Sequence, residues 1–351
     1  MSTLTRTQPR YWTIVQYIST LQECTATSTA SKPSSTVWST EVAITAETQI
    51  GFIGLGNIGR GAAANLVRAG HHVVVADLDP AKVASIVDLG GIGAESHLDV
   101  ANGADVIFTS LPGPAQIEAI GVGEGGQKGI LSALSPGATW VELSTNDLPT
   151  ARRLQIAACE VDVRLVDAPV SGGPEGAADG TLSIFVGGDA DDVDEIRPLL
   201  EVIGKKVDHV GGHGAGLTAK IAQVTLCYTQ TITLIEALLL GVKGGVDPAT
   251  MLDLIQNSAG RSYVAETYGP EILAGTYDAS FPLGHAAKDM RLALELADAV
   301  GVDLPFMRDV RDLYERSQAE YGAQAPHLLA AQLIERRNDL ILHQHLKDNT
   351  P

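Results

Sequence analysis

The chain has 351 residues, of which 45% are apolar, so it is long enough and apolar enough for roughly two globular domains. It carries 24 basic and 42 acidic side chains, and a net charge of −18 argues against a nucleic-acid partner because such a chain repels phosphate backbones. No uninterrupted apolar run approaches the roughly 20 residues of a membrane-spanning helix. The longest candidate, residues 234–242, contains Glu236.

Residues 1–46 differ in composition and in hydrophobic pattern from the rest of the chain. They are rich in Ser and Thr, carry few charges and show no hydrophobic period, which predicts a flexible N-terminal extension. Arg6 and Arg10 before a Ser/Thr-rich tract leave a transit peptide open, although three glutamates and the lack of an amphipathic helix argue against one. A start codon assigned too early would give the same pattern.

A βα pattern begins at Gln49 and predicts an α/β domain over residues 47–211. Short apolar segments alternate with helical ones, which indicates a mostly parallel sheet covered by helices on both faces. A helix is expected at 62–69, ending at Gly70. The predicted strands lie at 50–53, 72–76, 104–109, 139–143, 165–167 and 183–186.

The pattern changes near Gly211, and no strand is expected after Val210. Residues 212–345 are therefore predicted to form an all-α domain. Its first helix is long enough, at about 1.5 Å per residue, to run between the two domains. The predicted helices lie at 217–241, 248–257, 287–299 and 305–321, and residues 328–346 are a candidate amphipathic helix at an interface.

The segment from Gly54 to Gly59 reads GxGxxG, with Asn57 and Ile58 before its third glycine. The first glycine permits a tight turn, the second lets the backbone approach a pyrophosphate, and the third lets helix and strand pack closely. Alone the motif is weak evidence for a nucleotide site, because a chain with 37 glycines can contain this spacing by chance. Its position between a strand and a helix predicts a dinucleotide site, because the helix start offers free N–H groups to phosphates.

Asp77 ends the next strand, 18 residues after Gly59. A carboxylate there accepts hydrogen bonds from both ribose hydroxyls and repels a 2′-phosphate. The next residue is Leu78 rather than an arginine that would bind that phosphate. These residues predict NAD rather than NADP, the alternative being a solvated aspartate at a strand end.

Four blocks of the chain form a recognisable pattern. They are residues 51–56 with 65–66 and 69–71, residues 167–173 with 176–177 and 180–182, residues 214–216 with Lys220, and residues 281–283 with Lys288 and Asp289. With these blocks the chain resembles the β-hydroxyacid dehydrogenase family, within the 6-phosphogluconate dehydrogenase superfamily and including 3-hydroxyisobutyrate dehydrogenase. The resemblance covers about residues 50–320 and implies a doubly wound Rossmann domain, a long inter-domain helix, an all-α domain, and NAD(P)-linked oxidation of a 3-hydroxy acid to its semialdehyde.

Oxidation of an alcohol needs a general base within hydrogen-bond reach of the hydroxyl. Lys220, one turn into the long predicted helix, is the candidate, because burial beside a cofactor favours a neutral lysine. The resemblance implies that Lys220 is the family's catalytic lysine. A surface lysine beside a loop is the alternative.

The loop of Ser171, Gly172 and Gly173 suits a carboxylate, because small residues let backbone N–H groups converge on an anion. The resemblance places the substrate carboxylate there, whereas a plain strand-to-helix turn is the alternative. Lys288, expected with Asp289 at the start of a helix, is implied to lie near nicotinamide and substrate. A solvated Lys–Asp pair is the alternative for these two residues.

Further cofactor contacts are expected where two predicted strands end, because ligands bind at strand C-termini in doubly wound sheets. Leu111 with Pro112 and Ser144 with Thr145 occupy these positions, and Thr145 is the stronger candidate. One departure concerns the substrate. The family places asparagines three and four positions after its lysine, whereas this chain has Gln223 and Val224. A wider or more apolar pocket is expected, with Tyr263 and Tyr268 as candidate contributors.

Cysteine and histidine placement gives no sign of a metal site. Cys24, Cys159 and Cys227 are far apart and odd in number, which suits a reducing cytoplasm. We expect no metal, no nucleic acid and no membrane, but a small carboxylate-bearing substrate and a homodimer or homotetramer. The histidines interpreted as surface or loop residues are His71, His72, His209, His213 and His285.

Two other functions remain open from the sequence. The first is a reductase of imines or larger carbonyls on the same fold, and the second is a non-catalytic cofactor-binding protein. Relatives of either kind often lack the lysine, and this chain retains Lys220 and the Ser171 loop.

Overall fold

The computed structural model of the chain describes residues 44, 45 and 47–343. The predicted N-terminal extension, residues 1–46, lies outside the described residues except for 44 and 45. The end of the candidate helix 328–346 also lies outside them, beyond residue 343.

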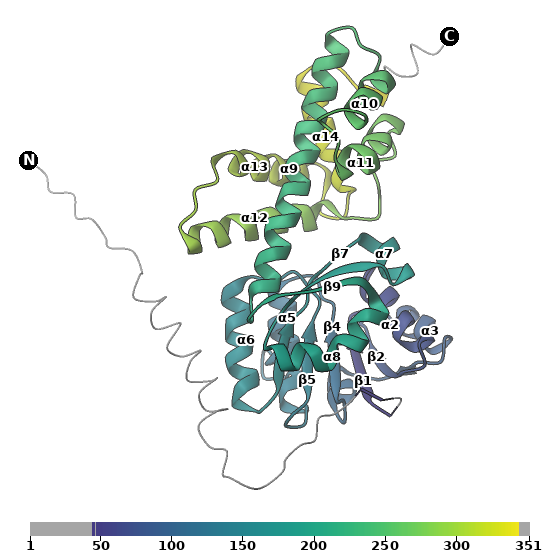
Figure 1. The fold of residues 1–351 in the computed structure, drawn as a ribbon, viewed down its shortest axis with the longest axis vertical. Helices are drawn as coiled ribbons and strands as arrows, with labels where there is room; N and C mark the ends of the chain where they lie inside the picture. Colours follow the sequence, from purple (N-terminus) through teal and green to yellow (C-terminus); the bar gives the residue numbers. More distant parts are fainter. Residues whose placement is uncertain (1–43, 46, 344–351) are drawn as a thin grey trace, which may run out of the picture. The chain divides into compact units, whose positions relative to one another are not determined.

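Residues 49–211 form a nine-stranded sheet with the order β3-β2-β1-β4-β5-β6-β8-β7, in which β9 also pairs with β8 (Figure 1). Strands β1 to β6 pair in parallel, and β8 runs antiparallel to β6 and β7 but parallel to β9. This confirms the predicted parallel-dominated sheet. The strands are β1 (Gln49–Ile53), β2 (His72–Ala76), β3 (Ile92–Gly93), β4 (Val106–Thr109), β5 (Thr139–Glu142), β6 (Arg164–Asp167), β7 (Val170–Ser171), β8 (Leu182–Gly187) and β9 (Gly204–Gly211).

Three strands were not predicted from the sequence. β3 and β7 have two residues each, too few to show a period. β9 reads GKKVDHVG and is exposed or half-buried over most of its length, so it lacks the apolar alternation that marks a strand. It pairs only with β8, and an edge position tolerates this polar sequence.

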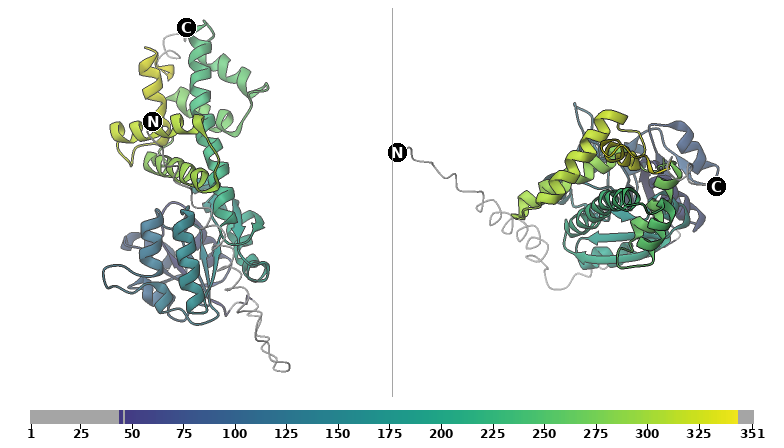
Figure 2. Two further views of the ribbon diagram at one scale, coloured as in Figure 1. Left: turned by 90° about the vertical axis from the view of Figure 1, so that its left-hand side faces the viewer. Right: turned by 90° about the horizontal axis from the view of Figure 1, so that it is seen from above.

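Helices cover both faces of the sheet, because successive side chains of a strand point to opposite faces. In β4, Phe108 joins a core formed with α2, α3, α7 and α8, whereas Ile107 joins the opposite core formed with α4, α5 and α6. Two views of the ribbon show these layers (Figure 2). The helices are α2 (Gly59–Arg68), α3 (Pro80–Val87), α4 (His97–Ala101), α5 (Pro114–Gly121), α6 (Leu148–Glu160), α7 (Gly173–Asp179) and α8 (Ala190–Ile203).

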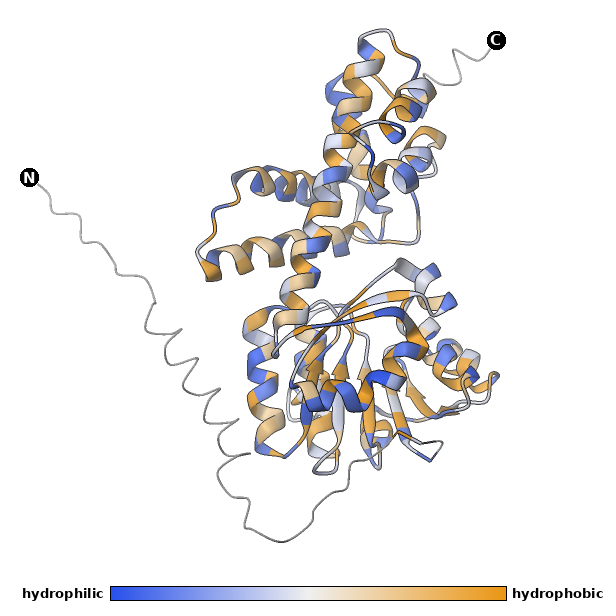
Figure 3. Cartoon of the chain, in the orientation of Figure 1, coloured by the Kyte–Doolittle hydropathy of each residue, from blue (hydrophilic) through white to orange (hydrophobic). Residues whose placement is uncertain are grey.

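The described residues after β9 form helices joined by loops, with α9 as the central helix. Figure 3 shows hydrophobic colour along much of α9, and the other helices pack around it. Averaged over a window, α9 is apolar enough to cross a membrane, but most of that window is buried, as in the core helix of a soluble protein. The helices are α9 (Ala215–Lys243), α10 (Pro248–Gln256), α11 (Tyr263–Ala274), α12 (Leu283–Val300), α13 (Pro305–Tyr321) and α14 (Ala330–Arg337).

The prediction for this part was wrong in two places. Helix α11 was missed because Gly269 and Pro270 interrupt its pattern. A Cβ at Gly269 would lie 2.5 Å from Leu252, so the close approach of α10 accounts for the glycine. Helix α12 begins four residues before its predicted start, and Lys288 therefore lies in its second turn rather than opening it.

Asp167, at the end of β6, holds the start of α9 against the sheet. Its carboxylate accepts hydrogen bonds from the backbone N–H groups of Gly214 at 2.6 Å and Leu217 at 3.0 Å. Burial raises the pKa of Asp167 to about 7, against the opposing effect of these donors. At Gly216 the helix lies so close to β8 that a Cβ would stand 2.3 Å from the carbonyl oxygen of Phe185.

Replacing Asp167 by alanine should lower the free energy of unfolding by about 2–4 kcal/mol, because two buried N–H groups lose their acceptor. Asp189 provides the control, since it precedes α8 but its exposed side chain makes no capping bond. Asp189→Ala should change stability by less than about 0.5 kcal/mol. Urea unfolding near neutral pH measures both, and equal effects would contradict the role of Asp167.

Candidate active site

The glycine loop between β1 and α2 has two glycines that the protein's own packing requires. Gly54 has φ +92°, and a Cβ there would lie 2.3 Å from the carbonyl oxygen of Ser110. A Cβ on Gly59 would lie 2.0 Å from the carbonyl oxygen of Gly54. Both positions therefore exclude any larger residue for steric reasons.

Gly56 differs, because no atom lies within 4 Å of the position its Cβ would take. The bare backbone faces open space at the start of α2, where Ile58 precedes the helix without a capping side chain and the first turn has no acidic residue. Uncapped N–H groups and the positive end of the helix dipole point to a bound anion. The loop thus fits the pyrophosphate of a dinucleotide.

Asp77 at the end of β2 lies beside this loop. Its carboxylate accepts hydrogen bonds from the N–H groups of Leu55 at 2.6 Å and Asp79 at 2.9 Å, and lies 3.5 Å from the ammonium of Lys82. Partial burial opposes ionisation, but these donors and Lys82 lower the pKa of Asp77 below its usual value. The neighbouring Leu78 is fully exposed. Asp77 thus presents a stable negative charge beside the cofactor loop.

Asn57, predicted to bind the cofactor, contacts the helical part of the chain. Its amide donates a hydrogen bond at 3.1 Å to the carbonyl oxygen of Ser280, in the segment before α12. Ile58 is half-buried and packs against the sheet core. The glycine loop is therefore joined to the segment that leads into α12.

Lys288 joins α12 to the ends of two strands. Its ammonium donates to the carbonyl oxygens of Pro112 at 3.2 Å and Thr145 at 3.3 Å. These loops follow β4 and β5, and the N–H of Leu111 donates to the Ser144 hydroxyl at 2.7 Å. Four of the residues predicted for the site thus come together at the carboxyl edge of the sheet.

Lys220, in the second turn of α9, is buried with 9% of its surface exposed. Burial lowers the pKa of its ammonium, and the nearby positive charge of Lys288 acts in the same direction. The negative charge of Asp289 opposes both effects. Asp289 lies 3.3 Å from Lys288 and accepts a hydrogen bond from Tyr228 at 3.0 Å. A buried amine beside a second cation is suited to exchanging a proton near neutral pH.

The Ser171 loop lies where β7 turns into α7. Gly172 has φ +131° and Gly173 has φ +65°, so both need glycine. Helix α7 begins at Gly173 without a capping side chain, but Pro174 has no N–H and Glu175 places an acidic side chain in its first turn.

The residues expected to shape the substrate pocket lie on α9 and α11, and the rings of Tyr263 and Tyr268 meet at a centroid distance of 5.9 Å. On α9, Gln223 is exposed, whereas Val224 is buried in the core of the helical domain. Tyr268 contacts the thiol of Cys227 and the ring of His327, while Tyr263 is largely exposed.

Glu142 and Asp167 are buried carboxyls that sequence reasoning did not single out. Each is the last residue of a strand and directly follows two apolar residues, and an acidic residue there is the signal that could have identified them. His213 lies in the loop between β9 and α9, as expected, but its side chain is only 8% exposed and lies 3.9 Å from Asp167. Burial lowers the pKa of His213 to about 4, so this imidazole is neutral.

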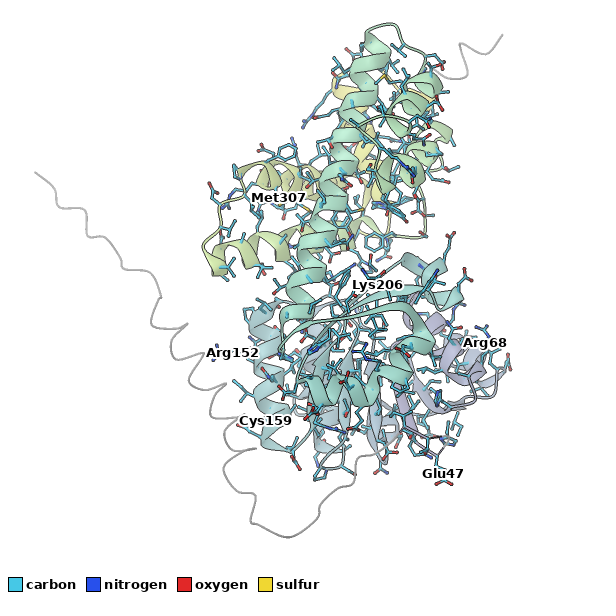
Figure 4. The ribbon with its side chains drawn as sticks, viewed as in Figure 1. Glu47, Arg68, Arg152, Cys159, Lys206 and Met307 are labelled. Carbon is cyan, nitrogen blue, oxygen red and sulfur yellow. The ribbon has the colours of Figure 1, made fainter. Side chains whose placement is uncertain are left out.

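The described residues hold no group of three or more His, Cys, Asp or Glu side chains that could bind a metal. Cys159 is exposed on α6, where Figure 4 labels it, and Cys227 is half-buried on α9.

Comparison with known proteins extends over both parts of the chain. The family described as "NAD binding domain of 6-phosphogluconate dehydrogenase" matches residues 49–211, and that described as "NAD-binding of NADP-dependent 3-hydroxyisobutyrate dehydrogenase" matches residues 214–334. A Pseudomonas aeruginosa 3-hydroxyisobutyrate dehydrogenase is 37% identical over 83% of this chain and 100% of its own length. A 2-(hydroxymethyl)glutarate dehydrogenase of Eubacterium barkeri is 39% identical over 77% of this chain and 89% of its own.

Solved structures give the same result. The structure of Mycobacterium tuberculosis 3-hydroxyisobutyrate dehydrogenase with L-serine is 29% identical, with a TM-score of 0.74, and covers 82% of this chain and 99% of its own. Imine reductases of Pseudomonas and Streptomyces aurantiacus, at 17% and 22% identity, share the fold. Sequence, fold and matched length together place this chain in the β-hydroxyacid dehydrogenase family of NAD-dependent oxidoreductases.

Proposed function

We propose that the chain interconverts a 3-hydroxy acid and its semialdehyde or 3-oxo acid, with Lys220 as general base in oxidation and general acid in reduction. The observation that carries this proposal is the burial of Lys220 close to Lys288 and Asp289, where the pKa of its ammonium is lowered. A neutral amine can take the hydroxyl proton, and the ammonium returns it in the reverse direction. Lys243, at the end of the same helix, is exposed rather than buried.

The cofactor is held by the first half of the chain. Gly54, Gly56 and Gly59 cradle the pyrophosphate at the start of α2, and Asp77 receives the ribose hydroxyls. Bound NAD supplies the hydride acceptor. The loops at Leu111–Pro112 and at Thr145 line the nicotinamide end, because they follow the strands at the carboxyl edge of the sheet.

The substrate carboxylate is proposed to bind the loop of Ser171, Gly172 and Gly173, whose uncapped N–H groups suit an anion. Lys288 adds a positive charge from α12, and Gln223 offers an amide on α9. Relatives are named for 3-hydroxyisobutyrate, 2-(hydroxymethyl)glutarate and L-serine, all small hydroxy acids.

We further propose residues 47–211 as the NAD-binding domain and 212–345 as the all-α domain, in a cytoplasmic homodimer or homotetramer. The helical part leaves large apolar side chains exposed, which supports contact with a second copy. Leu226 and Leu240 on α9 are 53% and 78% exposed, and Leu254, Tyr263 and Phe306 are also more than half exposed.

Replacing Lys220 by alanine should lower turnover by about 10²–10⁴-fold, because the proton then has no acceptor at the site. In the wild type, the rate of oxidation should rise with pH as Lys220 becomes neutral, with a midpoint below the ordinary lysine value of 10.5. The rate of reduction should fall through the same pH range. Lys220→Ala should lose the pH dependence of both oxidation and reduction but should still bind NADH.

The measurement is NAD reduction at 340 nm with 3-hydroxyisobutyrate, glycerate, serine, threonate and 2-(hydroxymethyl)glutarate. Lys243→Ala is the matched control and should keep wild-type rates. If Lys220→Ala retains near-normal turnover, Lys220 is not the acid–base group. Tight NADH binding without turnover of any substrate would instead favour a non-catalytic cofactor-binding protein.

The wild type should prefer NADH to NADPH by about 100-fold or more in kcat/KM, because a 2′-phosphate would meet the Asp77 carboxylate. Asp77→Asn keeps an oxygen acceptor for the N–H of Leu55 but removes the charge, and it releases Lys82. This variant should use NADPH at least about tenfold better than the wild type. Adding Lys82→Ala should reverse most of that gain, and equal use of both cofactors by the wild type would contradict the assignment.

Substituting glutamate for Leu240 should shift the protein toward smaller species, because a buried charge at a subunit contact is unfavourable. Light scattering after size exclusion measures the mass. Lys243→Glu, one turn further along α9 at an exposed polar position, should leave the assembly unchanged. A monomeric wild type would reject the proposed assembly.

A further inference from the structure

A buried polar row crosses the sheet just below the strand ends that hold Lys288. Thr109 on β4 pairs in register with Glu142 on β5, which pairs with Asp167 on β6. In-register side chains on parallel strands share one face. All three are at most 4% exposed, and Glu142 stands in the middle.

Glu142 receives hydrogen bonds on both carboxylate oxygens. The Thr109 hydroxyl donates to Oε2 at 2.6 Å, and the N–H of Ser144 donates to Oε1 at 2.7 Å. The Thr109 hydroxyl itself accepts from the indole N–H of Trp140 at 2.7 Å. Because an indole N–H can only donate, the threonine proton is left to point at Glu142.

The same pattern holds on the other side of the carboxylate. The Ser144 hydroxyl accepts from the N–H of Leu111 at 2.7 Å, so its own proton is free to face Glu142, with which it also interacts. Every group that hydrogen-bonds to the carboxylate in this network is therefore a donor. This arrangement is matched to an ionised carboxylate, which only accepts hydrogen bonds.

Through Ser144, Glu142 ties together the two loops that bind Lys288. The loop after β4 carries Leu111 and the Pro112 carbonyl, and the loop after β5 carries Ser144 and the Thr145 carbonyl. The ammonium of Lys288 bridges the two carbonyls. A change at Glu142 therefore reaches Lys288 without any direct hydrogen bond between them.

We propose that Glu142 is a positioning residue of the redox site, whose buried carboxylate fixes the two strand-end loops that line the nicotinamide and hold Lys288. This inference rests on the proposed role of those loops in cofactor binding. Glu142 touches neither cofactor nor substrate. It acts through the main chain of residues 111–112 and 144–145.

The ionisation state of Glu142 gives this role a measurable signature. Burial raises the pKa of Glu142 to about 7, against the opposing effects of Ser144, Thr109 and the positive charge of Lys288 on α12. Asp167 faces it from β6 as the second buried carboxyl. A proton on Glu142 would point at a hydrogen-bond donor and would replace one of the hydrogen bonds that the carboxylate accepts. Protonation therefore loosens the loops. NADH affinity should therefore fall as the pH drops through about 7.

The test is the dissociation constant of NADH, measured by fluorescence from pH 5.5 to 8.5. Glu142→Gln should weaken binding about tenfold at pH 8, and its affinity should no longer depend on Glu142 ionisation. Thr109→Val should move the midpoint to higher pH, because the carboxylate loses a donor that favours its charged form. If Asp167 were the titrating group instead, Thr109→Val should leave the midpoint unchanged. The Thr109 hydroxyl bonds to Glu142 and not to Asp167.

Two controls separate positioning from general loss of structure. Thr109→Ser keeps the hydroxyl and should keep the wild-type profile. Thr139 begins the same strand as Glu142, and its buried hydroxyl has no hydrogen-bond partner. Thr139→Val should therefore leave both the affinity and its midpoint unchanged.

The proposal is overturned if Glu142→Gln binds NADH with the same affinity and pH dependence as Thr139→Val. It is also overturned if Thr109→Val leaves the pH midpoint of NADH binding unchanged. Should Glu142→Gln fail to fold, Thr109→Val and Glu142→Asp decide, the latter because its shorter arm cannot reach both Thr109 and Ser144. Lys220→Ala should show the wild-type pH profile of NADH binding with strongly reduced turnover, so failure of the acid–base proposal is seen separately. A wild type that binds no NADH would overturn both.

Discussion

The buried carboxylate of Asp167 is the constraint on which the proposed chemistry depends. It holds the N–H groups that begin α9 against the end of β6, so the second turn of α9 lies at the carboxyl edge of the sheet. Lys220 is in that turn, and its burial follows from the close approach of helix and sheet at Gly216. The lowered pKa of Lys220 therefore comes mainly from packing, since the negative charge of Asp289 acts against it.

Elements with a strong hydrophobic period were predictable from the sequence. Strand β2 and helix α13 have the predicted ends, and α9 differs by two residues at each end. The glycine loop was predictable because its spacing is tied to a strand and a helix on either side. Segments without such a period, such as β9 and α11, were missed because long-range packing, rather than local pattern, determines their conformation.

The site was predictable only in part for a similar reason. The family blocks identified Lys220 and Lys288 but not what surrounds them, because contacts such as Lys288 to Thr145 join residues 143 positions apart. Glu142 and Asp167 were overlooked since a single carboxylate at a strand end looks solvated in sequence. Only the fold shows that register places them side by side beneath the site.

Gly56 and Gly59 belong to one motif but are retained for different reasons. Gly59 is required by the protein itself, because a side chain there would strike the backbone of Gly54, whereas Gly56 faces open space and is required only by a ligand. Selection for folding therefore acts on Gly59 alone, and selection for cofactor binding acts on both. A descendant of this protein that abandoned its cofactor would be free to drift at position 56 while keeping position 59. Variation at position 56 with glycine kept at position 59 would then show that the fold was still under selection after cofactor binding was lost.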